Sequence, residues 1–207
     1  VYMYYGNATA TTTSSSTLTF IASDDFEDNG ITEYSGANDD KSLFSTASTF
    51  AYGNSSYGLD NNGSEGNRAN DGGMARFDQS FSRSSSSLGV TVRYMQYIDT
   101  NGGDDEVCTL FAVESPVSNN NNYAVCTEQV AGSDYITLSE DITDTDIFSG
   151  TSLASTTVTY ADAWYEVEVD WETDGDMTVT LYDDNESQVA QIQASDSTYT
   201  SGGFGFT

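Results

Sequence analysis

Apolar and polar residues alternate with a period of two along much of this chain. In AWYEVEVDWE (residues 163–172) every second position is apolar, and the positions between carry mostly carboxylates. Successive side chains of a β-strand point to opposite faces, so such a run predicts a strand with one buried and one polar face. No window has the 3.6-residue period of an amphipathic helix. The alternation therefore predicts an all-β fold.

Several segments carry this pattern clearly, and turn residues separate them at short intervals. Asp-Gly in ETDGD and Asp-Asn in DDNES favour the positive φ of tight hairpin turns, so residues 163–194 are predicted to form a three-stranded meander. A Gly- and Asn-rich stretch, residues 51–73, is predicted to be a long polar loop. Many short antiparallel strands predict a sandwich or a closed barrel. The clearest strands are 88–99, 106–113, 122–129, 134–140, 163–172, 177–183 and 188–194.

The charge balance limits the function classes. The 207 residues suffice for one β-sandwich domain, and they carry 33 Asp and Glu against 5 Lys and Arg, with no histidine. Self-repulsion of this size favours adaptation to high salt, where the Debye length falls to about 3 Å at molar concentration; an acidic protein of ordinary salt is the alternative. Nucleic acid is not an expected partner because phosphate binding needs cations. The lack of histidine excludes histidine-based catalysis, and zinc is not expected.

The two cysteines and the sequons indicate an extracellular protein. Cys108 and Cys126 each lie in the centre of a strand-like run, with a polar loop between the runs. They predict a disulfide across adjacent antiparallel strands, two buried thiols being the alternative. No apolar run reaches the ~20 residues that span a bilayer, so no membrane insertion is expected. Four sequons in turn-like surroundings are candidate glycosylation sites. They are Asn7, Asn54, Asn62 and Asn185.

The N-terminal segment differs from the rest of the chain. YMYYGN (2–7), a Ser- and Thr-rich connector and LTFIASDDFED (18–28) together resemble a recurring junction in large surface proteins. The upstream part resembles the end of a domain of unknown function that closes with a YYGN-type strand. We therefore expect residues 1–16 to be the terminal strand and linker of a preceding domain, and residues 17–207 to form the sandwich.

Residues 17–207 resemble the concanavalin A-like, laminin G-type jelly roll. The resemblance lies in DDFE (24–27), in the WY-x-V-x-V strand of AWYEVEVDWE, in the D-G turn after it and in GGFGF (202–206) as a closing strand. It implies an antiparallel jelly-roll β-sandwich from a halophile surface protein or a virion protein. Members of the family bind glycans, act as adhesion modules or spacers, or, in a minority, cleave polysaccharides.

The strongest enzymatic signal is Glu168-Val169-Asp170-Trp171-Glu172, which resembles the E-x-D-x-E strand of retaining glycosidases that share this jelly roll. The resemblance makes Glu168 the nucleophile, Asp170 its helper and Glu172 the acid/base. Retaining chemistry needs carboxyls about 5 to 5.5 Å apart, whereas Cα atoms four residues apart on a strand are separated by about 13 Å. The alternation also starts earlier, at Glu166, as in a half-exposed acidic strand. We therefore expect no enzyme, with a glycosidase as an alternative.

Calcium is the expected ion, because carboxylates and backbone carbonyls supply hard oxygen ligands. Asp24, Asp25 and Glu27 are the first candidates, since the resembled family often holds calcium at this point. Solvated turns adapted to salt are the alternative for each candidate loop. Two other loops compete for the ion: Asp60, Asn62 and Glu65, and Asp99, Asn101 and Asp104.

Sugar binding requires an aromatic platform flanked by polar groups on one face of a sheet. Arg93, Met95 and Tyr97 share one face of the strand 88–99, and Tyr123 and Tyr135 are candidates to extend it. The alternative is that Arg93 makes an ordinary cross-strand pair with a carboxylate.

Together these patterns predict a non-enzymatic carbohydrate-binding or adhesion module of an extracellular, cell-surface or virion fibre protein. Its expected partners are surface glycans or a cell-surface receptor. The alternative is a structural spacer or a self-assembling filament subunit, a homo-oligomer within a larger parent assembly.

Overall fold

A computed structural model describes twelve stretches of the chain and one further position. The twelve stretches are residues 26–32, 34–36, 44–48, 51–53, 55–56, 58–61, 75–83, 89–98, 106–114, 121–130, 133–142 and 150–206, and residue 100 is the single further position. In these residues all regular structure is β-strand, and no helix is long and apolar enough to cross a membrane. The strands are β1 (Tyr34–Gly36), β2 (Phe44–Ala47), β3 (Gly58–Asn61), β4 (Ala75–Ser82), β5 (Val90–Ile98), β6 (Glu106–Val113), β7 (Tyr123–Val130), β8 (Ser133–Glu140), β9 (Thr151–Val158), β10 (Ala163–Trp171), β11 (Asp176–Tyr182), β12 (Gln188–Ser195) and β13 (Ser201–Phe206).

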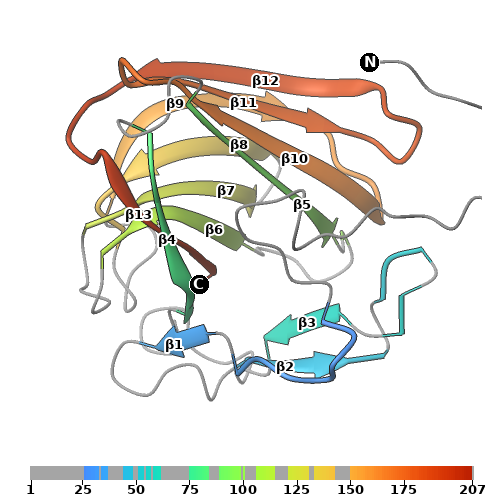
Figure 1. The fold of residues 1–207 in the computed structure, drawn as a ribbon. Coiled ribbons are helices and arrows are strands. Elements are labelled where there is room, and N and C mark those ends of the chain that lie inside the picture. The colour runs from blue at the N-terminus through green and yellow to red at the C-terminus, as the bar shows by residue number, and fades with distance from the viewer. Residues whose placement is uncertain are drawn as a thin grey trace, which may run out of the picture.

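The strands form an antiparallel jelly-roll β-sandwich, as the alternation and the resemblance predict. A seven-stranded sheet has the order β1-β4-β13-β6-β7-β8-β9, and a four-stranded sheet has the order β12-β11-β10-β5. The two sheets form separate layers, while β2 and β3 pair in a small hairpin beside them (Figure 1). Strand β13 lies between β4 and β6, so it is an inner strand that joins β1 and β4 to the rest of the larger sheet.

One apolar core lies between the two sheets. The alternation of apolar and polar residues in strand β10 produces this core, because burial alternates residue by residue and Val167, Val169 and Trp171 lie in the interior. Strand β8 supplies Ile136 and Leu138 from the facing sheet, and all five side chains belong to one cluster. Each buried aliphatic side chain of this size stabilises the fold by about 1.5 to 3 kcal/mol. The alternation read from the sequence is therefore the pattern that builds the core.

The predicted meander is present, with β10, β11 and β12 as neighbours in chain order. In its first turn Gly175 has a φ of 103°, as the Asp-Gly pair predicts. In the second turn the prediction is wrong in detail, because the positive φ of 60° falls on Glu186 and not on the Asp-Asn pair. Asp183 accepts hydrogen bonds from the backbone of Asn185 and Ser187, which closes this turn one residue later than expected.

Three other parts of the fold differ from the sequence prediction. Strands β4 (ARFDQSFS) and β9 (TSLASTTV) are not predicted. In β9, Ser and Thr give little apolar contrast between alternate positions, whereas β4 does alternate and is a signal that the sequence prediction missed. Within 51–73, predicted as a polar loop, β3 pairs with β2 over four residues. These short, polar strands depend on pairing with a neighbour more than on their own alternation.

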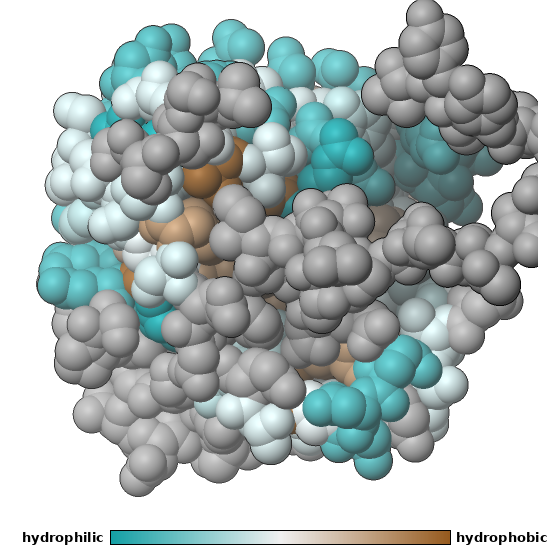
Figure 2. All heavy atoms as spheres, in the orientation of Figure 1, coloured by the Kyte–Doolittle hydropathy of each residue, from teal (hydrophilic) through white to brown (hydrophobic). Residues whose placement is uncertain are grey.

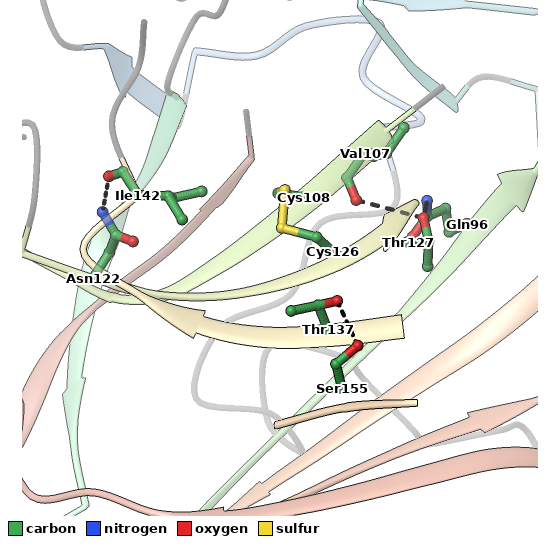
Figure 3. The surroundings of a disulfide bond; sticks show 9 residues. All are labelled: Gln96, Val107, Cys108, Asn122, Cys126, Thr127, Thr137, Ile142 and Ser155. Carbon is green, nitrogen blue, oxygen red and sulfur yellow. Dashed lines mark hydrogen bonds between the residues drawn. A yellow bond between two sulfur atoms is a disulfide. The ribbon is translucent and has the colours of Figure 1, made fainter. Parts of the chain in front are cut away.

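The predicted disulfide joins Cys108 of β6 to Cys126 of β7 (Figure 3). The two residues are directly opposite in the register of the strands, with Cα atoms 4.1 Å apart. Both are buried in a second apolar cluster, with Leu110, Val113 and Ile142, on the face of the seven-stranded sheet that points away from the core. The disulfide therefore cross-links neighbouring strands at the middle of the larger sheet.

Candidate functional site

The face of the four-stranded sheet that points away from the core carries the candidate site. Strand β10 pairs with β5 over nine positions, and its alternation directs Trp164, Glu166, Glu168 and Asp170 to this outer face. Their partners in the register on β5 are Tyr97, Met95, Arg93 and Thr91. We call this set of eight residues, with Tyr52, the sheet surface. Hydrophilic side chains also line the margin of the molecule along β12 (Figure 2).

An aromatic group forms one end of the sheet surface. The ring of Trp164 lies 5.5 Å from that of Tyr97 and 5.4 Å from that of Tyr52, both in edge-on geometry. Trp164 and Tyr97 are half-buried, and Tyr52 is exposed. Edge-to-face contacts of this kind hold rings in place while leaving part of each apolar face accessible. Such a group suits the apolar face of a sugar ring.

A row of charged groups adjoins the aromatic end. Arg93 forms an ion pair with Glu168, and its Nη1 lies 4.0 Å from Oε1 of Glu166. The side chain of Glu168 is only 12% exposed, whereas that of Arg93 is 63% exposed. Two residues further along each of the two strands, the hydroxyl of Thr91 donates a hydrogen bond to the carboxylate of Asp170 over 2.7 Å. The cross-strand alternative for Arg93 is therefore what the structure shows.

The other half of the outer face carries amide and hydroxyl groups. Gln191 of β12 donates to the hydroxyl of Thr180 over 3.0 Å, and Gln193 donates to the hydroxyl of Thr178 over 3.3 Å. In the register these two threonines are opposite Glu168 and Asp170. Polar rows thus run across all four strands. Groups of this kind can exchange hydrogen bonds with sugar hydroxyls.

The E-x-D-x-E residues occupy two different environments. Glu168 and Asp170 lie on the sheet surface, but Glu172 follows the end of β10 and belongs to the turn to β11. The backbone of Glu172 donates to Asp176 over 2.8 Å and accepts from Gly175 over 3.1 Å. The carboxylate of Glu168, the nucleophile in the alternative enzymatic hypothesis, is engaged by Arg93.

The structure separates the four predicted ligand-binding residues. Arg93 and Tyr97 lie on the sheet surface, whereas Tyr123 and Tyr135 belong to the seven-stranded sheet. Tyr123 is fully buried in the core, and Tyr135 is half-buried on the opposite face of its sheet. The alternation along each strand fixes the face of a residue, but not which sheet its strand joins.

Sequence reasoning missed two members of the aromatic group. Trp164 shares the parity of Glu166 and Glu168, so the alternation that marks the acidic face also places this tryptophan there. Tyr52 gives no such signal, because it precedes β3 in the stretch predicted as a polar loop.

A second polar group, the carboxylate–tyrosine cluster, lies at one end of the core. It consists of Glu140, Asp141, Asp196, Tyr123 and Tyr199, with Tyr123 donating to Asp196 and Tyr199 donating to Asp141. Burial, with the negative charges of Asp196 and Asp141, raises the pKa of Glu140. Burial alone would raise the pKa of Asp196, but hydrogen bonds from Tyr123 and from Thr198 hold it below the usual value. Burial also raises the pKa of both tyrosines.

Most predicted calcium ligands and sequons lie outside the described residues. These are Asp24, Asp25, Asn62, Glu65, Asp99, Asn101 and Asp104, and the sequons Asn7 and Asn54. Glu27 accepts a hydrogen bond from the backbone of Ser56 over 2.6 Å. Among the described residues no three His, Cys, Asp or Glu side chains are grouped to hold a metal. Asn185 is exposed in the β11–β12 turn, and its amide donates to Asp184 over 2.8 Å.

Comparison with solved structures shows a similar fold in a distant protein, and further structures align with lower scores. The enzymatically active domain of tailspike protein 2 from bacteriophage CBA120 is 13% identical, with a TM-score of 0.50 over 84% of this chain. This chain spans 25% of the tailspike chain. A protein of unknown function from Shewanella oneidensis aligns at 12% identity and a TM-score of 0.47, over 86% of this chain and 71% of that one. Lectin II from Ulex europaeus aligns at 14% and 0.39, over 65% and 71%. No protein-family model and no curated protein matches the sequence.

Proposed function

We propose that this chain is a non-enzymatic carbohydrate-binding module of an extracellular surface or fibre protein adapted to high salt. The observation that carries the proposal is the aromatic group of Tyr52, Trp164 and Tyr97 beside polar rows on one partly exposed sheet face. The rings offer apolar area to a sugar ring, and the carboxylates and amides offer hydrogen bonds to its hydroxyls. The four-stranded sheet holds all of these groups except Tyr52, which precedes β3.

Three further features support the non-enzymatic, extracellular part of the proposal. The ion pair with Arg93 occupies Glu168, and Glu172 belongs to a turn beyond the strand. The ion pair gives the Glu168 carboxylate a structural role, as expected of a half-exposed acidic strand. The disulfide is of a kind that persists in oxidising compartments. The excess of 33 acidic over 5 basic residues favours a setting in which salt screens the surface.

Calcium and glycosylation belong to the same proposal as secondary features. We propose that Asp24, Asp25 and Glu27 hold calcium in the full protein, and that the exposed Asn185 accepts a glycan. Both features fit an adhesion module on a cell or virion surface, with surface glycans or a receptor as its partner.

Replacing Trp164 by alanine is the sharpest test of the proposed surface. A glycan array in molar salt first identifies a bound oligosaccharide, and titration calorimetry then compares the variant with the parent chain. We expect Trp164→Ala to weaken binding about 30-fold, since truncation of a central aromatic anchor costs about 2 kcal/mol. Tyr135→Ala is the matched control, because it removes a half-buried ring from the other sheet and is expected to bind normally. A blank array, or equal losses in both variants, would contradict the proposal.

A further inference from the structure

The arginines that the structure describes differ in burial and in their partners. Arg76 and Arg83 are buried, and each donates to backbone carbonyl oxygens inside the fold. Arg93, on the sheet surface, is the one cation with an exposed side chain among the residues that the structure describes. Any anionic ligand of the described surface therefore has Arg93 as its available counter-charge.

Arg93 is already neutralised where it lies. Glu168 pairs with it directly and Glu166 lies 4.0 Å away, while Asp170 is bonded to the neutral hydroxyl of Thr91. Three carboxylates beside one guanidinium leave a formal excess of two negative charges on the sheet surface. A ligand that needed the guanidinium would have to break its pair with the largely buried Glu168 and leave that carboxylate unpaired, which is costly.

This excess charge lies within reach of a ligand on the aromatic group. Trp164 and Glu166 are two residues apart on the same face of β10, a separation of about 7 Å along a strand. The substituents of a sugar ring stacked on Trp164 therefore approach the carboxylate of Glu166. The aromatic group positions the sugar ring, and the carboxylates contact the substituents of that ring.

We infer that the sheet surface selects glycans by charge: it binds chains with free amino groups more tightly than uncharged chains, and it rejects chains with carboxylates or sulfates. The inference rests on the proposed function and assigns a ligand class to the same surface. An ammonium group on the ligand gains a short pair with Glu166, whereas a uronate meets like charge at the same distance. In molar salt the Debye length is about 3 Å, so contact pairs keep their effect while long-range steering is lost.

Two matched ligand pairs separate charge from ring shape. The first is a glucosamine hexasaccharide and its fully N-acetylated form, and the second is a glucose hexasaccharide and its form oxidised to glucuronate. We expect the glucosamine chain to bind about fivefold more tightly than its N-acetylated form, from one contact ion pair in a solvent-like dielectric. We expect the glucuronate chain to bind more weakly than the glucose chain by a similar factor. Raising the salt from 0.1 M to 3 M is expected to remove the long-range part of each ratio and to leave the part that comes from the contact pair.

Protein variants then locate the effect. Glu166→Gln is expected to bring the ratio between the glucosamine and N-acetylated chains close to one. Glu186→Gln removes an exposed carboxylate in the β11–β12 turn and is expected to leave that ratio unchanged. If no chain of either pair binds, the proposed function itself fails. If the chains bind with equal affinity, or the glucuronate chain binds best, the binding surface stands and the charge selection is overturned.

Discussion

The two ends of the sandwich core treat their polar groups differently. At one end, the Arg83 end, arginine and tyrosine groups bond carboxylates or backbone carbonyls, although Oε2 of Glu140 and Nε1 of Trp171 are buried there without a hydrogen-bond partner in the described structure. At the other, the Gln96 end, two glutamine oxygens are buried without a hydrogen-bond partner in the described structure. Buried polar groups stabilise a fold when they are bonded and destabilise it when they are not. The comparison therefore predicts opposite effects for substitutions at the two ends.

Arg83 organises the first end. It is 3% exposed, its guanidinium donates to the carbonyls of Tyr199, Glu172 and Thr173, and its Cζ lies 5.6 Å from the ring centre of Trp171. These contacts tie the β10–β11 turn and the segment before β13 to the end of β4. One buried cation thus connects three segments that are distant in sequence.

The second end is built from neutral side chains. Gln96 of β5 donates to Thr127 of β7 over 2.6 Å across the core, but its own Oε1 has no hydrogen-bond partner in the described structure. Oε1 of Gln129, two residues along β7 from Thr127, is in the same state, and both glutamines are 8% exposed. This end holds more acceptors than the described donors can satisfy.

The largest expected effect is at the Arg83 end. Arg83→Met keeps the length of the side chain but leaves its buried carbonyl acceptors without the cation, and we expect a loss of about 3 kcal/mol in the free energy of unfolding. Urea unfolding in molar salt measures it. Glu186→Gln is the control, since it changes an exposed carboxylate in the β11–β12 turn, and we expect it to alter the free energy of unfolding by less than about 0.5 kcal/mol. Equal losses in the two variants would remove the basis of the comparison.

A smaller effect, of opposite sign, is expected at the Gln96 end. Gln129→Met conserves volume and removes an unbonded acceptor, so we expect a gain of about 1 kcal/mol in the free energy of unfolding. Gln96→Met also breaks the bond to Thr127 and is expected to gain less. Chemical denaturation of the three proteins side by side provides the measurement. A loss in Gln129→Met would mean that its oxygen is bonded in solution, for example to a buried water.

The sequence predicts the sandwich because its main information is local. Alternation in β10 and β8 identifies the core face residue by residue, and the spacing of Cys108 and Cys126 predicts a cross-strand disulfide that the structure contains. Strand β9 escapes prediction because Ser and Thr occupy both of its faces, and its place in the sheet comes from pairing, which is not a local property. Strand β4 does alternate, since Ala75, Phe77 and Phe81 share one parity, so the local signal was present there.

The candidate site is less predictable for the same reason. Arg93 and Tyr97 share a face by parity alone, so the sequence identifies them. Trp164 joins them only because β10 pairs with β5 across a gap of 64 residues between Ile98 and Ala163, and Tyr52 joins from a separate segment. Tyr123 and Tyr135 have suitable chemistry but lie in the other sheet. The odd or even position of a residue along its strand determines the face it occupies, whereas its neighbours on other strands are determined by the strand register.

The smallest expected effect tests the one strained member of the Arg83 end. The pKa of Glu140 is raised above 4.5, so its ionised form destabilises the fold at neutral pH, and protonation removes this cost as pH falls through the raised pKa. Asp196 has the opposite sign, because its lowered pKa gives stability that is lost only below about pH 3.8. We expect Glu140→Gln to exceed the parent chain by about 0.5 kcal/mol at pH 7 and to match it near pH 4.5. Urea unfolding across this range in molar salt measures the gap; a gap that stays constant would place the strain elsewhere in the cluster.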